Sequence, residues 1–240
     1  MPIWTQRASF SWRQNVGFYE HRYEVVRDIE RKGLLRRFLD RPAQLAIRLE
    51  GPHQVISFAP DGLLIGMLTP EANVDVLRAA TESIVEALNP DLRSYPLFKF
   101  QSLEPCAKSY DEARALAAAA FLGVDHPGRV TDFALSLDGK LEVPFDDYHL
   151  QAGIVEAAEA TGRLARPLSR GIEDINSPSS LWRPEDLPPV AVFCDVELDV
   201  APLEDVDDIV AAMFSTIASA RKVADELRVS MLKPLQGCEL

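Results

Sequence analysis

Three carboxylates alternate along one predicted strand late in the sequence. They are Asp195, Glu197 and Asp199, in the stretch VFCDVELDV. Alternate residues of a strand share a face, so the three side chains point the same way. Hard cations such as Mg²⁺ and Mn²⁺ prefer several oxygen ligands, so this row suggests a divalent-metal-dependent hydrolase or nuclease. Neighbours in the row lie about 6.5 Å apart, so a metal would need ligands from other elements too. A solvated strand face is the alternative.

His149 is the best candidate for a further metal ligand or an acid–base group. It follows Asp146 and Asp147 in FDDYH, but no histidine in the chain has the spacing of a metal-binding motif. A surface loop is the simpler explanation for this histidine. Cys194, next to Asp195, would act as a nucleophile only with a histidine close to it, so we predict a buried thiol.

The chain lacks the sequence signatures of the common phosphate-binding and nucleophilic enzymes. It has no G-x-x-x-x-G-K-[ST], no G-x-G-x-x-G and no G-x-S-x-G. Its three cysteines have no C-x-x-C spacing, which disfavours a zinc ribbon and a disulfide framework. We therefore predict no cofactor, with Mg²⁺ or Mn²⁺ as the alternative for the carboxylate row.

The composition is that of a globular protein with an acidic surface. Of 240 residues, 47% are hydrophobic and 26% are charged, and the formal net charge is −12. Such a charge disfavours general affinity for nucleic acid or for anionic membranes. No apolar run approaches the ~20 residues of a transmembrane helix, and the N-terminus lacks the layout of a signal peptide. We expect a cytoplasmic protein without membrane contact.

Positive charge gathers in the N-terminal part. Residues 1–50 carry a formal charge of +4, which leaves −16 for the remainder. Apolar residues at helical spacing predict two helical pieces within residues 18–40, broken at Gly33. The arginines of these pieces that we predict to bind a partner are Arg27, Arg31, Arg36 and Arg37. Trp182, in the proline-rich loop 165–189, is a further predicted contact. The alternative is packing on the same chain, because acidic residues interleave with the arginines.

Short strands and helices follow, delimited by turn residues. The first strand patterns, which predict an antiparallel meander and one further strand, are 44–50, 54–59, 63–68 and 97–103. Thr69 and Pro70 predict the start of a helix that ends near Asn89.

The second half repeats this mixture of strands and helices. Asp138-Gly139 predicts a hairpin turn, and residues 146–161 favour a helix. The last predicted elements are a strand, a helix and a strand: 190–200, 203–221 and 227–232. Acidic residues in the first turn of the helix suit its dipole.

Two pairs of similar segments indicate an internal duplication. PEANVDVLRAA (70–80) matches PLEDVDDIVAA (202–212), and FKFQSLEP (98–105) matches LRVSMLKP (227–234) in the same order. The sequence therefore predicts an α+β fold of duplicated strand–helix–strand units. We expect a mostly antiparallel sheet, helices on one face and a pseudo-twofold relation. The predicted segments are a basic N-terminal helical segment and two α+β repeats: 1–42, 43–123 and 124–240.

This alignment makes the carboxylate row specific to the second repeat, since its counterparts are Leu63, Ile65 and Met67. The leading functional hypothesis is a non-catalytic protein of a bacterial-type cytoplasmic system. It would work through protein–protein contact, as a homo-oligomer or as an accessory subunit. One alternative is the metal-dependent hydrolase or nuclease, and another is a small-ligand binder with its site between the two repeats.

Overall fold

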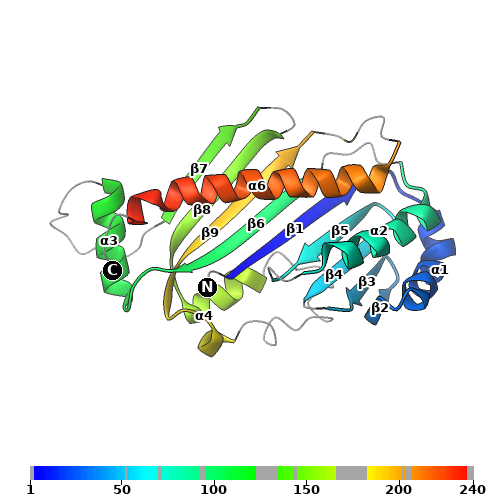
Figure 1. Cartoon of the computed structure of the whole chain (residues 1–240), viewed down its shortest axis with the longest axis horizontal. Coiled ribbons are helices and arrows are strands. Elements are labelled where there is room, and N and C mark those ends of the chain that lie inside the picture. Colours follow the sequence, from blue (N-terminus) through cyan, green and yellow to red (C-terminus); the bar gives the residue numbers. More distant parts are fainter. Residues whose placement is uncertain are drawn as a thin grey trace.

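One antiparallel sheet of nine strands runs through the described chain in the computed structural model (Figure 1). The structure describes residues 3–51, 53–69, 72–91, 96–122, 134–142, 145–165, 183–201, 203 and 207–236. The strands are β1 (Ile3–Ser11), β2 (Leu35–Arg41), β3 (Gln44–Leu49), β4 (Gln54–Ala59), β5 (Gly62–Met67), β6 (Leu97–Pro105), β7 (Ala134–Lys140), β8 (Phe145–Glu156) and β9 (Val190–Val200). Their order across the sheet is β2-β3-β4-β5-β1-β6-β9-β8-β7, so β1 and β6 lie in its middle.

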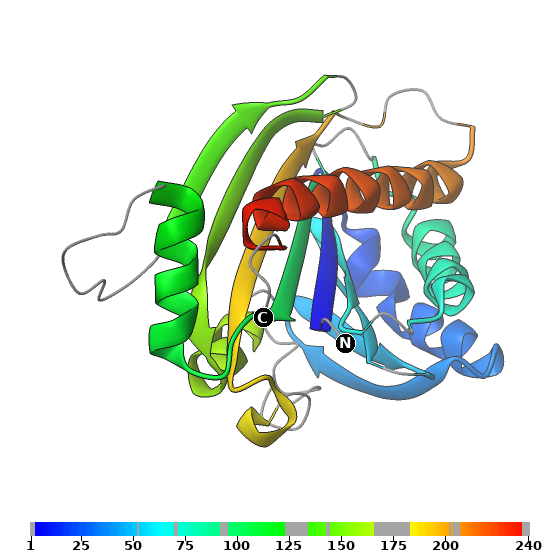
Figure 2. The ribbon, with the colours of Figure 1, turned by 60° about the vertical axis from the view of Figure 1, so that its left-hand side comes forward.

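Helices cover the two faces of this sheet unequally (Figure 2). The helical elements of the described residues are α1 (Gly17–Arg31), α2 (Val74–Leu88), α3 (Tyr110–Leu122), α4 (Ala157–Ala165), the 3₁₀ helix η2 (Pro184–Asp186) and α6 (Ile209–Gln236). We call the face under α1, α2, α3 and α6 the helix face. The opposite face is the open face, and among the described residues α4 and the segment around η2 cover it at one end. The α+β class is confirmed, and the helices lie on one face with the exception of α4.

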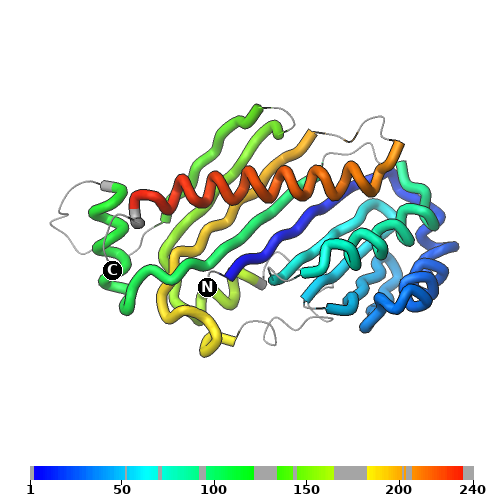
Figure 3. The backbone as a smooth tube through the Cα atoms, viewed as in Figure 1, coloured from blue at the N-terminus to red at the C-terminus, as the bar shows by residue number. Residues whose placement is uncertain are grey.

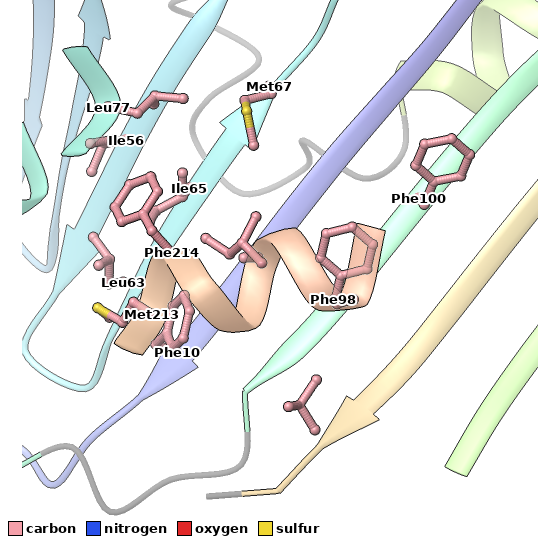
Figure 4. Packing of buried hydrophobic residues seen from close by; sticks show 14 of the residues in the cluster. Phe10, Ile56, Leu63, Ile65, Met67, Leu77, Phe98, Phe100, Met213 and Phe214 are labelled. Atoms are coloured by element: carbon pink, nitrogen blue, oxygen red, sulfur yellow. The ribbon is translucent and has the colours of Figure 1, made fainter. Parts of the chain in front are cut away.

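The main core lies between the helix face and α6, which crosses the middle of the sheet (Figure 3). Met213 and Phe214 of this helix pack among Phe10 of β1, Ile65 of β5 and Leu77 of α2 (Figure 4). Because strand side chains alternate between faces, the same strands present their other residues to the open face. This alternation separates the core from the polar surface on which the predicted carboxylates lie.

The predicted meander is confirmed to within one residue, as β3, β4 and β5, and the strand predicted at 97–103 is β6. The predicted start of the following helix is wrong, since α2 begins at Val74. Asn73 is its N-cap, and its side-chain oxygen accepts hydrogen bonds from the backbone N–H groups of Asp75 and Val76. Asparagine is as good a cap as threonine, and here it lies next to the first helical residue. Pro70 lies outside the described residues.

Only the first of the two predicted N-terminal helical pieces is a helix. α1 ends at Arg31, and Gly33 follows with φ +70°, a conformation that glycine adopts without strain. The second piece is strand β2, paired with β3 at an edge of the sheet. Its register shifts between Leu35 and Arg37. Such a bulge breaks the two-residue period, so the strand shows apolar spacing that resembles a helix.

The hairpin of β7 and β8 exists, but its turn is not at Asp138-Gly139. Both residues lie within β7, which continues to Lys140, and β8 begins at Phe145. The glycine is explained by its partner across the ladder, because a Cβ on Gly139 would collide with the ring of Tyr148. The helix predicted at 146–161 is wrong over most of its length, since β8 continues to Glu156 before α4 begins.

The C-terminal strand predicted at 227–232 is also wrong, because α6 runs without interruption from Ile209 to Gln236. Its buried residues keep helical spacing through that stretch, and this long-range period outweighs the local alternation: Met213, Ile217, Ala220, Ala224 and Met231. The acidic residues near its start precede the helix. Asp208 acts at its N-terminus, where Oδ1 accepts a hydrogen bond from the N–H of Ala211 at 2.8 Å.

The repeat alignment therefore fails in its second part, which matches strand β6 with the end of helix α6. Its first part matches two helix starts that each follow a strand. The predicted segment boundaries fall within one continuous sheet, and β1 is a central strand within the segment predicted to be helical. Most of loop 165–189, with Trp182, lies outside the described residues. In the parts of the chain that the structure describes, no helix is both long and apolar enough to span a membrane.

Candidate functional site

The three predicted carboxylates lie along β9 on the open face, and the alternating residues Val196, Leu198 and Val200 are buried on the helix face. The predicted alternation is therefore confirmed. The counterparts in the repeat alignment, Leu63, Ile65 and Met67, belong to the helix-face core. The alignment thus paired residues from opposite faces of the sheet, which explains why acidic residues were aligned with apolar ones.

Two of the carboxylates share one cation from the neighbouring strand β6. Lys99 Nζ lies 3.1 Å from Asp195 Oδ2 and 3.1 Å from Glu197 Oε2. Gln101, two residues further along β6, donates from Nε2 to Asp195 Oδ2 at 2.9 Å. The β6–β9 register, with Lys99 opposite Glu197 and Gln101 opposite Asp195, brings these groups together. The result is a partly buried ionic cluster in the middle of the open face.

The third carboxylate, Asp199, faces a different group of residues. With Glu197 it lines a cavity of about 540 Å³ together with His149, Asp138 and Asp147 from the β7–β8 hairpin. His149 Nδ1 lies 2.5 Å from Asp138 Oδ1. Burial raises the pKa of Asp199, and the nearby charges of Glu197 and Asp147 raise it further.

The structure thus divides the predicted metal ligands between two places. Asp195 does not line the cavity that contains His149. In the described ranges, no group of three or more histidine, cysteine, aspartate or glutamate side chains is arranged to hold a metal ion. Lys99 already neutralises Asp195 and Glu197, so a cation would have to displace its ammonium group. The metal site stays a prediction, and a metal ion there would compete with Lys99 for the carboxylates of Asp195 and Glu197.

The raised pKa of Asp199 predicts that this carboxylate destabilises the protein at neutral pH. An aspartate whose folded pKa lies above its unfolded value near 3.8 reduces stability as the pH rises through the folded value. Because Asp199 is exposed, solvent screens these interactions, and we expect Asp199→Asn to raise the Tm by only about 1 °C at pH 7. Below the unfolded pKa the difference should vanish, because both side chains are then neutral.

Thermal melts of the two proteins from pH 3 to pH 8 measure this effect. Asp138→Asn is the matched control, since the side chain of Asp138 is 81% exposed and bonds to His149. An Asp199→Asn variant that is no more stable than the wild type at pH 7 would contradict the prediction.

Cys194 is excluded as a nucleophile by its surroundings. It lies on the helix face of β9 with 1% of its surface exposed. Burial, followed by the charge of Asp195, raises the pKa of its thiol to about 12. The thiol is therefore protonated at neutral pH, as the predicted buried cysteine should be.

A further cavity of the open face extends from the middle of the sheet toward β3. This open-face cavity has a volume of about 1050 Å³. Its lining residues come from eight strands, the β2–β3 and β4–β5 turns and α4, and its polar and charged members are Arg7, Ser9, Ser11, Arg41, Gln44, Ser57, Asp61, Lys99, Gln101, Gln151, Arg163 and Asp195. Leu64, Leu97 and Phe193 add apolar surface. Polar groups over a partly apolar surface are typical of ligand sites.

Charge distinguishes this cavity from the protein as a whole. Four cationic side chains line it against two carboxylates, in a chain whose net charge is −12. Arg163 of α4 is held in place by Glu159, at 2.6 Å, and lies over the ring of Phe193. Asp195 Oδ1 is inaccessible to solvent and has no hydrogen-bond partner among the described residues. The lining therefore holds two more cationic than anionic side chains, of which Lys99 and Arg163 also form ion pairs, and one buried acceptor.

The arginines predicted to bind a partner lie at the β2 edge of the sheet, on α1 and β2. Arg27 and Arg31 are exposed on α1, while Arg36 and Arg37 are exposed on the edge strand β2. The predicted ion pairs of α1 are present in part, since Asp28 Oδ2 lies 2.9 Å from Lys32 Nζ. Hydrogen bonds from Lys32 and Ser83 lower the pKa of Asp28 and tie α1 to α2. Partner binding at these arginines stays a prediction.

Sequence reasoning missed the residues that line the open-face cavity. Arg7 and Ser9 lie on β1, within the segment predicted to be helical, although QRASFS alternates polar and apolar residues as strands do. Lys99 and Gln101 were within a correctly predicted strand, but nothing local indicated that they meet β9. No known protein-family model matches the chain, and no curated protein matches it at a significant level.

Proposed function

We propose that the protein binds a small polar ligand with an anionic group in the open-face cavity. The observation that carries this proposal is the excess of cationic side chains around a cavity of about 1050 Å³ in an acidic protein. Arginine binds carboxylates and phosphates through paired N–H donors, and a partly enclosed site strengthens that attraction. The ligand also needs a hydroxyl or amino group, because Asp195 Oδ1 is a buried acceptor to which no described residue donates a hydrogen bond.

Binding without chemistry is the role that these residues favour. Serines line the cavity, but its described lining contains no histidine or cysteine to act as a base or nucleophile. The groups that line the cavity support recognition of charge and hydrogen bonds, which suits a sensor or carrier of a phosphorylated or carboxylated metabolite. This role corresponds to the small-ligand hypothesis. It replaces protein–protein contact as our leading functional hypothesis.

An internal duplication is part of this proposal, with the cavity at the junction of two halves. The element order β1-α1-β3-β4-β5-α2 is followed by β6-α3-β7-β8-β9-α6, with β2 and α4 as additions. The sheet order reads β3-β4-β5-β1 on one side and β7-β8-β9-β6 on the other, and β1 pairs antiparallel with β6. This topological correspondence supports a pseudo-twofold relation more strongly than the sequence matches do.

The ligand proposal is tested with a thermal-shift panel followed by calorimetric titration. The panel pairs sugar phosphates, nucleotides and dicarboxylates with uncharged analogues, and we expect only anionic members to raise the Tm. Arg7→Gln should weaken the best ligand by about 10–100-fold, the contribution of a hydrogen bond to a charged group.

Arg27→Gln is the matched control, because it removes the same charge from the exposed surface of α1. Equal losses of affinity in the two variants would mean that net charge, rather than the cavity, attracts the ligand. A panel in which neutral analogues bind as well as anionic ones would also contradict the proposal.

A further inference from the structure

A third cavity lies on the helix face, under the middle of α6. This α6 cavity has a volume of about 350 Å³, and its lining includes Trp4 of β1, Phe100 and Ser102 of β6, and Arg221 and Arg228 of α6. Its volume is that of a site for a compound with one or two rings. Phe100 and Ser102 alternate along β6 with Lys99 and Gln101, so the α6 cavity and the open-face cavity lie on opposite sides of the sheet.

Ser102 has a hydrogen-bonding capacity that the described protein does not use. The residue is 1% exposed, and its Oγ has neither solvent access nor a hydrogen-bond partner among the described residues. A hydroxyl loses its hydrogen bonds to water on burial, so an unpaired buried hydroxyl is unfavourable. Because Ser102 lines the α6 cavity, a polar atom of a bound molecule can supply the missing partner.

Arg221 supplies a positive charge that no acid of the described chain engages. Its guanidinium carbon lies 4.3 Å from the centre of the Trp4 ring, and no ion pair holds it. The other arginine of the cavity differs, since Arg228 pairs with both Glu104 and Asp225. Arg228 is therefore neutralised and fixed, while Arg221 keeps its donors for an anion.

Two aromatic rings form the apolar side of the α6 cavity. The Trp4 and Phe100 rings lie 5.9 Å apart, centre to centre, and are inclined by 30°. Offset and tilted rings at such distances attract a further ring, which adds to the energy of burying its surface. The cavity thus combines a place for a ring, a cation and a hydroxyl within one small volume.

We propose that the α6 cavity binds a small aromatic carboxylate. The ring packs against Trp4 and Phe100, and the carboxylate accepts hydrogen bonds from Arg221 and from the hydroxyl of Ser102. This site is independent of the ligand proposed for the open-face cavity and does not rest on it.

Calorimetric titration with benzoate tests the proposal, with benzamide as the uncharged probe and cyclohexanecarboxylate as the non-aromatic one. We expect benzoate to bind at least tenfold more tightly than either probe. Arg221→Gln should weaken benzoate binding by tenfold or more, and Ser102→Ala by several fold. The Tm of unliganded Ser102→Ala should equal or exceed that of the wild type, because the variant removes an unpaired buried hydroxyl.

Two variants serve as controls. Lys233→Gln removes the same charge from an exposed residue of α6 that does not line the cavity, and should leave benzoate affinity within about twofold. Arg7→Gln in the open-face cavity should also leave it unchanged, which separates this test from that of the proposed function.

Several results would overturn the proposal. They are the absence of benzoate binding at millimolar concentration, full affinity in Arg221→Gln, or a loss of binding in Arg7→Gln that exceeds the loss in Arg221→Gln. Full affinity in Ser102→Ala, with affinity lost in Arg221→Gln, would reject the contact between the carboxylate and Ser102.

Discussion

Replacing Lys99 with methionine is expected to destabilise the protein by about 2–3 kcal/mol at neutral pH. The variant leaves Asp195 and Glu197 without the ammonium group that lies 3.1 Å from each. Removing one member of a fully buried ion pair lowers the free energy of unfolding by about 3–5 kcal/mol. We expect less here because the side chains of Lys99 and Glu197 are 20% and 38% exposed. Urea denaturation measures the change, which corresponds to a fall in Tm of about 4–12 °C.

The control is the same substitution at Lys140, whose side chain is 89% exposed and whose Nζ lies 4.0 Å from Asp147. Lys140→Met should change stability by less than about 0.5 kcal/mol. Adding Glu197→Gln to Lys99→Met should restore part of the lost stability, because one uncompensated charge is removed. Equal stabilities of the two methionine variants would mean that water, rather than Lys99, compensates the carboxylates.

The ionic cluster shows which parts of a site a single sequence can predict. The common orientation of Asp195, Glu197 and Asp199 follows from the period of a strand, which is local. Their neighbours depend on the pairing of β6 with β9, and Lys99 lies 98 residues from Glu197 in the chain. No local pattern specifies that pairing. The sequence therefore predicted the common face of the three carboxylates correctly. It did not predict that Lys99 forms ion pairs with two of them.

The errors in secondary structure have the same origin. The bulge in β2 gives a strand helical spacing, and Gly139 resembles a turn residue because it makes room for the ring of Tyr148. In both cases the explanation is a neighbouring strand, β3 or β8. Where a period was long enough, as along α6, the information was present in the sequence. There a short alternation within residues 227–232 was given more weight than the helical period around it.

Truncation of Phe214 to alanine is expected to destabilise the protein by about 3–5 kcal/mol, the most of any change that we consider. Phe214 is 4% exposed and packs in the core between α6, α2 and the sheet (Figure 4). Its loss removes buried apolar surface and leaves a void, because the strands and α2 cannot close around the missing ring. The expected fall in Tm is about 6–20 °C for a chain of this size.

A series of variants separates the contributions to this effect. Phe214→Leu keeps most of the volume and should cost less than about 1.5 kcal/mol. Arg78→Met removes only the cation that lies 5.4 Å from the Phe214 ring centre, which is worth about 0.5–1 kcal/mol. Val229→Ala, at a site on α6 that is 42% exposed, should change stability by about 0.5 kcal/mol or less. If Val229→Ala were as damaging as Phe214→Ala, the helix itself rather than its packing on the sheet would limit stability. The order that we expect instead shows that the packing of α6 on the sheet, rather than the helix alone, stabilises the fold.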